Sequence, residues 1–375
     1  MDFDFHYYAT YSAARFAGYA PEQASKIAKS AQFVDEFSKG NFDGVITNPS
    51  YTAFDFKLSD YLKQGIINDT QLAQIWMPYH FLPAFANERS LIIGDNKDLN
   101  GDMNREDYKI KFRADLADIH LKCITLPNGI LYDDVVSLRG VEGNDLLAIG
   151  LKMHVLADTY AHQGFVGYKK KDVNCLTGQK IMLGKGETPS KVWDAAGIGH
   201  APCGHYPDYG YAWYQYHPAW ADAEKAYVNR NNPEIFAYAY IAMAKAMNAH
   251  RNANVSNQYQ IILTQDDIKT RWQEIKNLLT LGDDDVVSRE EASLFQEKEW
   301  CEYTLKKDDE LTDAQIASQM NIEKDKKEIM EYFKNQSNIG ELRFFNAAAN
   351  AHKNMVSQRM KENIMYSLEE FPESM

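Results

Sequence analysis

The chain has 375 residues, of which 45% are hydrophobic and 25% are charged, and this composition is typical of globular proteins. Its formal net charge of −13 repels nucleic-acid phosphates at long range, so a nucleic acid is not the expected partner. No stretch of about 18 apolar residues predicts a transmembrane helix. Residues 1–11 lack the regions of a signal peptide, so we expect a cytoplasmic protein, although non-standard export leaves no such pattern.

Helical patterns dominate the first part of the chain. Residues 21–37 begin with a proline and place three alanines and Asp35 on one face, and Gly40 is the expected stop. Residues 68–85 predict another helix that two prolines interrupt. Residues 95–107 form a polar loop without the Glu that closes a calcium-binding loop.

The middle of the chain predicts a central helix followed by a long loop. The helix opens at Asn144 and ends at Gly164. Residues 168–212 are rich in Gly and Pro with irregular apolar spacing, and loops of this length are more often functional than idle. Helical periodicity returns over residues 218–227 and 233–250, which we predict as two further helices.

The last third of the chain is polar and helical. Three motifs resemble capping boxes, namely Thr264-x-x-Asp267, Ser288-x-x-Glu291 and Thr312-x-x-Gln315. The first opens a helix whose apolar face contains Ile268, Trp272, Ile275 and Leu279. Because strand signals are few and short, we predict an all-α fold with a metal-binding helical domain over residues 1–255 and a C-terminal helical extension over residues 256–375 that packs on it.

The most informative motif is His154-x-x-x-Asp158-x-x-x-His162 in the central helix. Residues four apart lie one above the other on a helix, and this row continues an apolar stripe through Leu147 and Leu151. Burying two imidazoles and a carboxylate on such a face is costly unless something satisfies them, and a divalent metal does so. The motif therefore predicts a metal site in preference to a structural hydrogen-bond network.

Further His and Asp residues outside this helix are candidate metal ligands. They are Asp4, His6, Asp35, His80, His200, His205 and Asp208. Small residues frame the last three and let backbone and ligand approach closely. Considered one at a time, these residues have simpler interpretations. His80 would be a hydrogen-bonded core residue, Asp35 would be a helix cap or an ion-pair partner, and Asp4 would be a surface residue. Together with the central motif, the set favours a metal centre with many ligands.

The spacing of these residues distinguishes among classes of metal site. The chain lacks the paired Glu-x-x-His of di-iron bundles, the His-Glu-x-x-His of zincins and the adjacent His-Asp of HD phosphohydrolases. Its four cysteines are scattered and form no Cys-x-x-Cys pair. The remaining pattern, a thiolate-free site with more than three ligands, favours two or three zinc ions that share bridging carboxylates.

The central motif also resembles the zinc-binding helix of the zinc-dependent phospholipase C and single-strand-specific nuclease superfamily, all-α enzymes with a trinuclear zinc cluster. The ordered segments DFHYYATYSAARFAGY, AQFVDEF, HFLP, HVLADTYAHQGF and GHAPCGHYPD are more similar to a poorly characterised bacterial branch of that superfamily, a domain of unknown function. This resemblance covers about residues 1–250. It implies a helical bundle with long loops, to which the C-terminal helices are an addition.

The resemblance also implies a role for matching positions in the first half of the site. His154 would be a terminal ligand, and Asp158 would be the carboxylate that bridges two zinc ions. His80 and His162 match the histidine ligands before and after this pair, although the spacing to His162 is shorter than is usual. Asp35 matches an upstream aspartate that contacts the cluster and can serve as general base.

Two parts of the chain depart from the pattern of the superfamily. His205 and Asp208 correspond to a later His and acid pair, with the spacing His-x-x-Asp in place of His-x-x-x-Glu. The secreted enzymes expose a tryptophan by signal cleavage and use its amine as a ligand. This chain has Met1 there, so we expect Asp4 or His6 to replace that ligand.

The expected function is that of a zinc-dependent phosphoric ester hydrolase in which Asp35 and Asp158 are catalytic and a metal-bridged water attacks phosphorus. The acidic surface favours a phospholipid or a small phosphodiester over a nucleic acid as substrate. Two alternatives stay open. One is a metallohydrolase that acts on a different bond. The other is a non-enzymatic binding protein in which the histidines are structural or hold a single metal, and the polar C-terminal helices fit an interaction surface.

Overall fold

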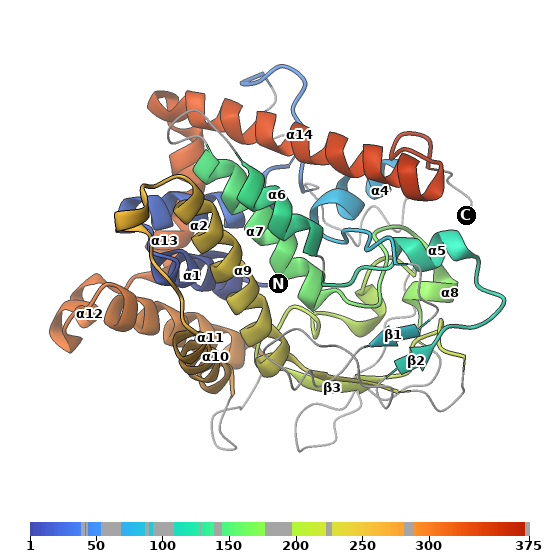
Figure 1. The fold of residues 1–375 in the computed structure, drawn as a ribbon, viewed down its shortest axis with the longest axis horizontal. Helices are drawn as coiled ribbons and strands as arrows, with labels where there is room; N and C mark the ends of the chain where they lie inside the picture. The colour runs from blue at the N-terminus through green and yellow to red at the C-terminus, as the bar shows by residue number, and fades with distance from the viewer. Residues whose placement is uncertain are drawn as a thin grey trace.

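The computed structural model describes residues 1–38, 42, 44–53, 69–86, 90–92, 109–127, 129–138, 145–176, 197–222, 227–280 and 289–371. Over these residues the fold is all-α, as expected, with two small two-stranded sheets beside the helices (Figure 1). No helix in these ranges combines the length and the apolar character needed to cross a membrane.

The first 176 residues contribute the central helix and seven further helices to the described part of the chain. They are the π-helix η1 (Asp4–Ala9) and the α-helices α1 (Thr10–Phe16), α2 (Pro21–Glu36), α4 (Asp69–Tyr79), α5 (Asp118–Cys123), α6 (Gly129–Ser137), α7 (Asp145–Ala161) and α8 (Lys171–Asn174). The antiparallel strand pairs are β1 (Ser90–Ile92) with β2 (Lys109–Lys111), and β3 (Trp213–Tyr216) with β4 (Val228–Asn231). The short 3₁₀ turn η3 (Ala201–Cys203) precedes the second pair.

The C-terminal part of the chain is helical throughout its described residues. It contains α9 (Asn232–Ala253), η4 (Asn257–Tyr259), α10 (Gln265–Leu279), α11 (Arg289–Tyr303), η5 (Thr304–Asp308), α12 (Asp313–Gln319), α13 (Ile322–Lys334), η6 (Gln336–Asn338) and α14 (Ile339–Ile364). Helix α14 runs along the upper edge of the molecule in Figure 1 and packs against α4, α7 and α13.

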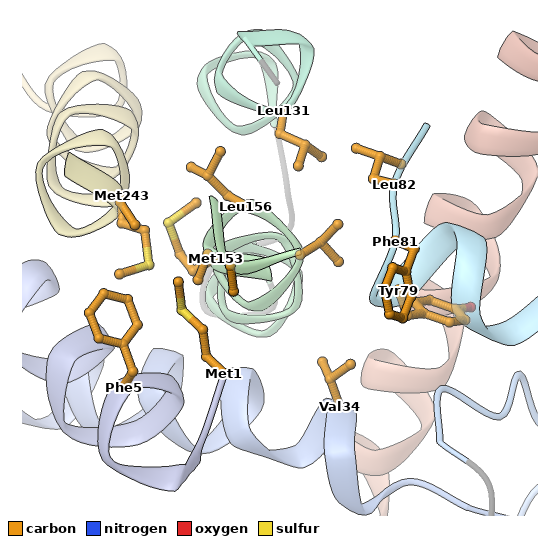
Figure 2. Packing of buried hydrophobic residues seen from close by; sticks show 14 of the residues in the cluster. Met1, Phe5, Val34, Tyr79, Phe81, Leu82, Leu131, Met153, Leu156 and Met243 are labelled. Carbon is orange, nitrogen blue, oxygen red and sulfur yellow. The ribbon is translucent and has the colours of Figure 1, made fainter. Parts of the chain in front are cut away.

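Helix α7 is the centre of the fold. Fourteen of its 17 residues are buried, so the rest of the protein encloses this helix on nearly all sides. It packs against α2, α6, α9 and α14. Figure 2 shows Val34 of α2, Tyr79 of α4 and Met243 of α9 arranged around it. The helix that carries the central His and Asp motif is therefore held from several sides.

Helices α2 and α7 approach each other closely at Gly150. A Cβ added at Gly150 would lie 2.3 Å from the carbonyl oxygen of Ile27, so only glycine fits at this crossing. Next to it, the Ser30 hydroxyl donates a hydrogen bond to the Leu147 carbonyl at 2.6 Å. This contact fixes the position of α2 along the axis of α7. It places the last turn of α2, which contains Asp35, beside the central motif.

The C-terminal helices hold the N-terminal segment. The Tyr8 hydroxyl in η1 donates to Asp325 of α13 at 2.6 Å, and the Phe5 ring lies edge-on to Trp300 of α11. Arg271 of α10 binds Asp308 at 2.9 Å. Buried residues from both expected parts of the chain belong to one hydrophobic core, and the division at residue 255 stays a prediction.

Most of the expected helices are confirmed. They are α2, α4 with Pro78 in its last turn, α7, α9 and α10, and the Thr264 and Thr312 side chains accept the capping hydrogen bonds predicted for them. The apolar face predicted for α10 is also confirmed. The stop at Gly40, the loop over residues 95–107 and the Ser288 cap lie outside the described residues.

The helix predicted over residues 218–227 is wrong in its described part. Pro218 and Ala221 form isolated β-bridges with Leu176 and Phe112, so the backbone there is extended. The apolar spacing that resembled a helix reflects Trp220, which is fully buried and donates its indole N–H to the Gly164 carbonyl at 2.9 Å.

We expect Gly150→Ala to lower the free energy of unfolding by about 1–3 kcal/mol, because the added methyl group overlaps the Ile27 carbonyl and forces α2 and α7 apart. Gly340→Ala in α14 is the matched control. An added Cβ there meets nothing within 4 Å, so it should be neutral or stabilise by up to about 1 kcal/mol. Urea denaturation measures both variants, and equal changes would contradict the close helix contact.

Candidate metal centre

Helix α7 supplies the centre of the site. His154 and Asp158 lie one turn apart on it, and both are almost fully buried. His162 follows the last helical residue, and its backbone N–H donates to the Asp158 carbonyl at 2.9 Å, which continues the helical turn. The three side chains of the predicted motif therefore lie along one row. His154 Nε2 and His162 Nδ1 are 3.3 Å and 3.8 Å from Asp158 Oδ2.

The N-terminal segment covers this row. The α-amino nitrogen of Met1 donates to Asp158 Oδ1 at 2.9 Å and to Asp208 Oδ1 at 3.1 Å. In η1, the imidazole of His6 stacks on that of His154 with ring centroids 3.7 Å apart, and its Nε2 lies 3.3 Å from Asp158 Oδ1. Met1 and His6 thereby converge on the same carboxylate.

His80 and Asp35 approach Asp158 from the other side. His80 follows α4, and its Nδ1 lies 3.2 Å from Asp158 Oδ2 and 3.3 Å from His154 Nε2. The Asp35 carboxylate at the end of α2 is 3.7 Å from His154 Nε2 and 3.8 Å from His80 Nδ1. The Asp35 side chain keeps 32% of its surface exposed, so it lies at the open side of the site.

A second carboxylate, Asp208, organises the far end of the row. His162 Nε2 lies 2.9 Å from Asp208 Oδ1, and His200 Nε2 lies 3.3 Å from Asp208 Oδ2. The segment from 197 to 208 therefore contributes His200 and Asp208, and His162 comes from the end of α7. The Phe81 ring stacks on His162, with centroids 4.6 Å apart, and holds this imidazole in place.

Backbone carbonyls determine which nitrogen of three imidazoles carries hydrogen. A carbonyl only accepts, so His80 Nε2 donates to Thr52 at 2.8 Å, His162 Nδ1 donates to His80 at 2.6 Å, and His200 Nδ1 donates to Gly204 at 2.8 Å. In the neutral rings, the opposite nitrogen is then a lone pair that faces a carboxylate oxygen. Such a pair is stabilised by a proton on the nitrogen or by a cation between the two atoms, and the carboxylates around His80 raise its pKa against the effect of burial.

The candidate ligands form three groups whose donor atoms lie within 4.8 Å of one another. The groups are His6, Asp35 and His154; then His80, His154 and Asp158; then His162, His200 and Asp208. His154 belongs to two groups, and Asp158 contacts residues of all three. The structure therefore brings together most of the residues that the sequence singled out.

Two candidates lie outside these groups. The His205 side chain is 76% exposed, and its Nδ1 is 3.8 Å from Asp208 Oδ2. Asp4 is buried beside Asp2 and Glu297, and burial together with these acids raises its pKa to about 8. Of the two residues expected to replace the N-terminal amine, His6 faces Asp158.

Sequence reasoning missed the α-amino group of Met1 and the neighbouring Asp2. Burial disfavours the Met1 ammonium, but Asp158, Asp208 and Asp35 outweigh this effect and raise its pKa to about 12. Burial and Asp208 raise the pKa of Asp2 to about 6. A methionine side chain is not a typical ligand here, so residue type gave no signal for its backbone nitrogen.

At neutral pH the two central carboxylates of the site are ionised, whereas two of its imidazoles are neutral. Burial opposes ionisation of Asp158 and Asp208, yet the Met1 ammonium and the surrounding imidazoles hold both pKa values well below the usual range. Burial lowers the pKa of His6 and of His200 to about 4. At neutral pH these two imidazoles are therefore neutral. His200 directs the lone pair of Nε2 at Asp208, because its Nδ1 carries the hydrogen.

Comparison with known protein families gives one match. Residues 1–360 match the model of a family described as a family of unknown function (DUF6765). The chain belongs to this family. The match spans both the site and the C-terminal helices, so the helices after residue 255 are part of what defines the family. No curated protein and no solved structure matches the chain.

For the metal-free protein we expect His6 and His200 to contribute a loss of stability as the pH drops from 6.5 to about 4. Their unfolded imidazoles take up protons near pH 6.5, whereas the folded ones do so only near pH 4, so the unfolded state binds more protons at these sites. The raised pKa values of Asp2 and Asp4 contribute in the opposite direction, so the test compares the pH slopes of variants.

Urea denaturation at several pH values in the presence of a chelator measures this slope. His200→Gln should make it shallower. His205→Gln is the matched control and should retain it, because the pKa of His205 is raised, mainly by its contact with Asp208. Equal slopes in the wild-type protein and His200→Gln would contradict the neutral state of His200.

Proposed function

We propose that the chain is a zinc-dependent hydrolase of phosphoric esters, similar to the zinc-dependent phospholipases C, with a metal-bridged water as nucleophile. One observation carries the proposal. Three imidazoles each donate one N–H to a backbone carbonyl and direct the other nitrogen at a buried carboxylate, namely those of His80, His162 and His200. Metal-binding histidines in proteins have this arrangement, in which the outer hydrogen bond fixes the ring and its tautomer.

The donor set fits zinc in chemistry and in spacing. The groups offer imidazole nitrogens and carboxylate oxygens, the usual non-sulfur ligands of zinc. For zinc bonds of about 2.0–2.2 Å, tetrahedral geometry separates neighbouring ligand atoms by about 3.4 Å. The nitrogen-to-oxygen distances at Asp158 and Asp208 are 3.2 Å for His80 and 3.3 Å for His200.

Unpaired buried atoms support the same interpretation. Neither ring nitrogen of His6 has a hydrogen-bond partner, and Nδ1 of His154 also lacks one, although both rings are fully buried. Buried polar groups are normally hydrogen-bonded, so such atoms call for an explanation. A cation bound to His6 supplies one, because the nitrogen nearest Asp158 then serves as a ligand.

The roles of the residues follow from their positions. His6, His80, His154, His162, His200, Asp158 and Asp208 would hold the ions. Bound zinc lowers the pKa of a coordinated water to about 7 and polarises a phosphoryl oxygen. Asp35 lies at the open side within 3.8 Å of two of these histidines, where it can accept a proton from the attacking water.

A small phosphodiester or a phospholipid is the substrate class that we favour. Two or three divalent cations outweigh the carboxylates Asp35, Asp158 and Asp208, so the loaded centre attracts an anionic ester. The net charge of −13 on the whole chain disfavours approach of a long nucleic acid.

The decisive experiment measures zinc content and turnover together. We expect more than one zinc ion per chain after zinc-replete purification, and hydrolysis of bis(4-nitrophenyl) phosphate that a chelator abolishes and zinc restores. Asp158→Asn should lower kcat/KM by about 10²–10³-fold or more, because it removes a buried charge that several ligands share.

Asp145→Asn is the control for this variant, since Asp145 lies on the same helix but pairs with His250. It should keep both metal and turnover. Less than one zinc ion per chain with no chelator-sensitive turnover would overturn the proposal. Tight zinc binding without turnover on phosphodiesters or phospholipids would instead favour the binding-protein alternative.

A second test addresses the carbonyl that orients His200. Gly204 has a φ of +61°, and Gly44 has a φ of +85° elsewhere, and an added Cβ at either position meets nothing within 4 Å. Ala at either position is strained by about 1 kcal/mol or more. Only Gly204 accepts the His200 N–H, so Gly204→Ala should weaken zinc binding about 10–100-fold.

Competition with a chromophoric chelator measures the zinc affinity of both variants. Gly44→Ala should also lose stability but should retain wild-type zinc binding. Equal loss of zinc affinity in the two variants would show that the Gly204 carbonyl has no specific role.

A further inference from the structure

Arg230 in β4 is a buried cation without a counter-ion among the described residues. Its side chain is fully buried. Its Nη2 donates to the carbonyls of Tyr160 and Ala161 at 2.9 Å each, at the C-terminal end of α7. Its Nε and Nη1 have no hydrogen-bond partner. Two of the three nitrogens of this guanidinium are therefore unsatisfied.

The charge of Arg230 needs compensation. A guanidinium stays protonated in proteins, and a buried charge is normally paired. The carbonyls at the end of α7 carry the negative end of the helix dipole, which offsets only part of a full charge. By contrast, the other buried arginine nearby in sequence, Arg271, has Asp308 as its partner at 2.9 Å.

Two tyrosines lie on the same buried face of the β3 and β4 hairpin. Tyr214 is the direct cross-strand partner of Arg230, and Tyr216 is two residues further along β3. Their rings stack with centroids 5.9 Å apart, and both side chains are 1% exposed. Neither hydroxyl has a hydrogen-bond partner. A buried tyrosine hydroxyl usually has one, so the two unpaired groups beside an unpaired guanidinium require a common explanation.

The neighbouring cysteine does not supply the missing charge. Cys203 is fully buried close to Arg230 and to both tyrosines. Burial raises the pKa of its thiol, and Arg230 only partly opposes this effect, so the thiol is neutral at physiological pH. The unpaired atoms of the arginine and the two tyrosines are all able to donate, and a ligand that only accepts matches them.

We propose that Arg230, Tyr214 and Tyr216 form an internal site for a small inorganic anion of halide size, such as chloride. Guanidinium N–H groups and phenolic O–H groups would donate to it. A water molecule would satisfy some of these hydrogen bonds but would leave the charge of Arg230 unbalanced. The site uses none of the residues of the three metal groups.

Anion binding at this site would stabilise the C-terminal end of α7. Arg230 holds the Tyr160 and Ala161 carbonyls immediately before His162, and a bound anion lowers the cost of burying that arginine. We therefore expect the folded protein to be stabilised by chloride in a saturable manner, since a ligand that binds only the folded state stabilises it by mass action.

The first experiment is crystallisation of the full chain in bromide. An anomalous difference peak beside Arg230 Nε is expected in both zinc-loaded and metal-free crystals, which separates this site from any halide bound to zinc. Absence of the peak, with a water or no density at that place, would overturn the proposal. The wild-type protein suffices for this experiment.

The second experiment compares the Tm of metal-free protein in sodium chloride and in sodium gluconate at equal ionic strength. Chloride should raise the Tm of the wild-type protein, and Tyr216→Phe should reduce that rise. Tyr240→Phe is the matched control, because its hydroxyl contacts Arg271, whose charge Asp308 already balances. A Tm that does not differ between the two salts would contradict an internal anion.

Discussion

The site depends on the burial of one ionised carboxylate, Asp158. Its side chain is 1% exposed, and the Met1 ammonium, His6, His80 and His154 surround its two oxygens at 2.9–3.3 Å. An ionised carboxylate in such a position is stable only if positive charge surrounds it. The Met1 ammonium is shared between Asp158 and Asp208, so it leaves the balance incomplete. The cations that we propose complete it.

The packed core brings His and Asp side chains from distant segments of the chain together at this point. Helix α7 carries the carboxylate, and the close contact at Gly150 fixes α2 beside it. The residues after α4 and the segment 197–208 add the histidines that face the opposite side. Aromatic packing holds some of these rings, as between Phe81 and His162. Ligands on rigid elements keep their spacing without a bound ion, which suits a pre-organised centre.

The central row was predictable because helical spacing alone determines it. His154 and Asp158 are four residues apart, and this places them one above the other whatever surrounds the helix. The choice between His200 and His205 was not predictable from residue type. The positive φ of Gly204 turns the chain so that its carbonyl meets His200, and His205 is left in solvent.

The N-terminal candidate ligands illustrate a second limit of sequence reasoning. Asp4 and His6 are two residues apart in a helical segment, so they point in different directions, and only one of them can face α7. Sequence alone did not say which. The Met1 nitrogen carries no residue-specific signal at all. Trp220 explains why the helix over residues 218–227 was wrong, since its packing against the Gly164 carbonyl needs extended backbone.

The hydrogen bond between η1 and α13 has a consequence for the order in which the protein folds. Tyr8 and its partner Asp325 are 317 positions apart. A ribosome delivers Tyr8 long before Asp325, so this hydrogen bond forms only after α13 has been synthesised, whereas η1 can pack against α2 and α7 earlier. The closure of η1 by the C-terminal helices is therefore a late step of assembly, and the surroundings of His6 are complete only after it.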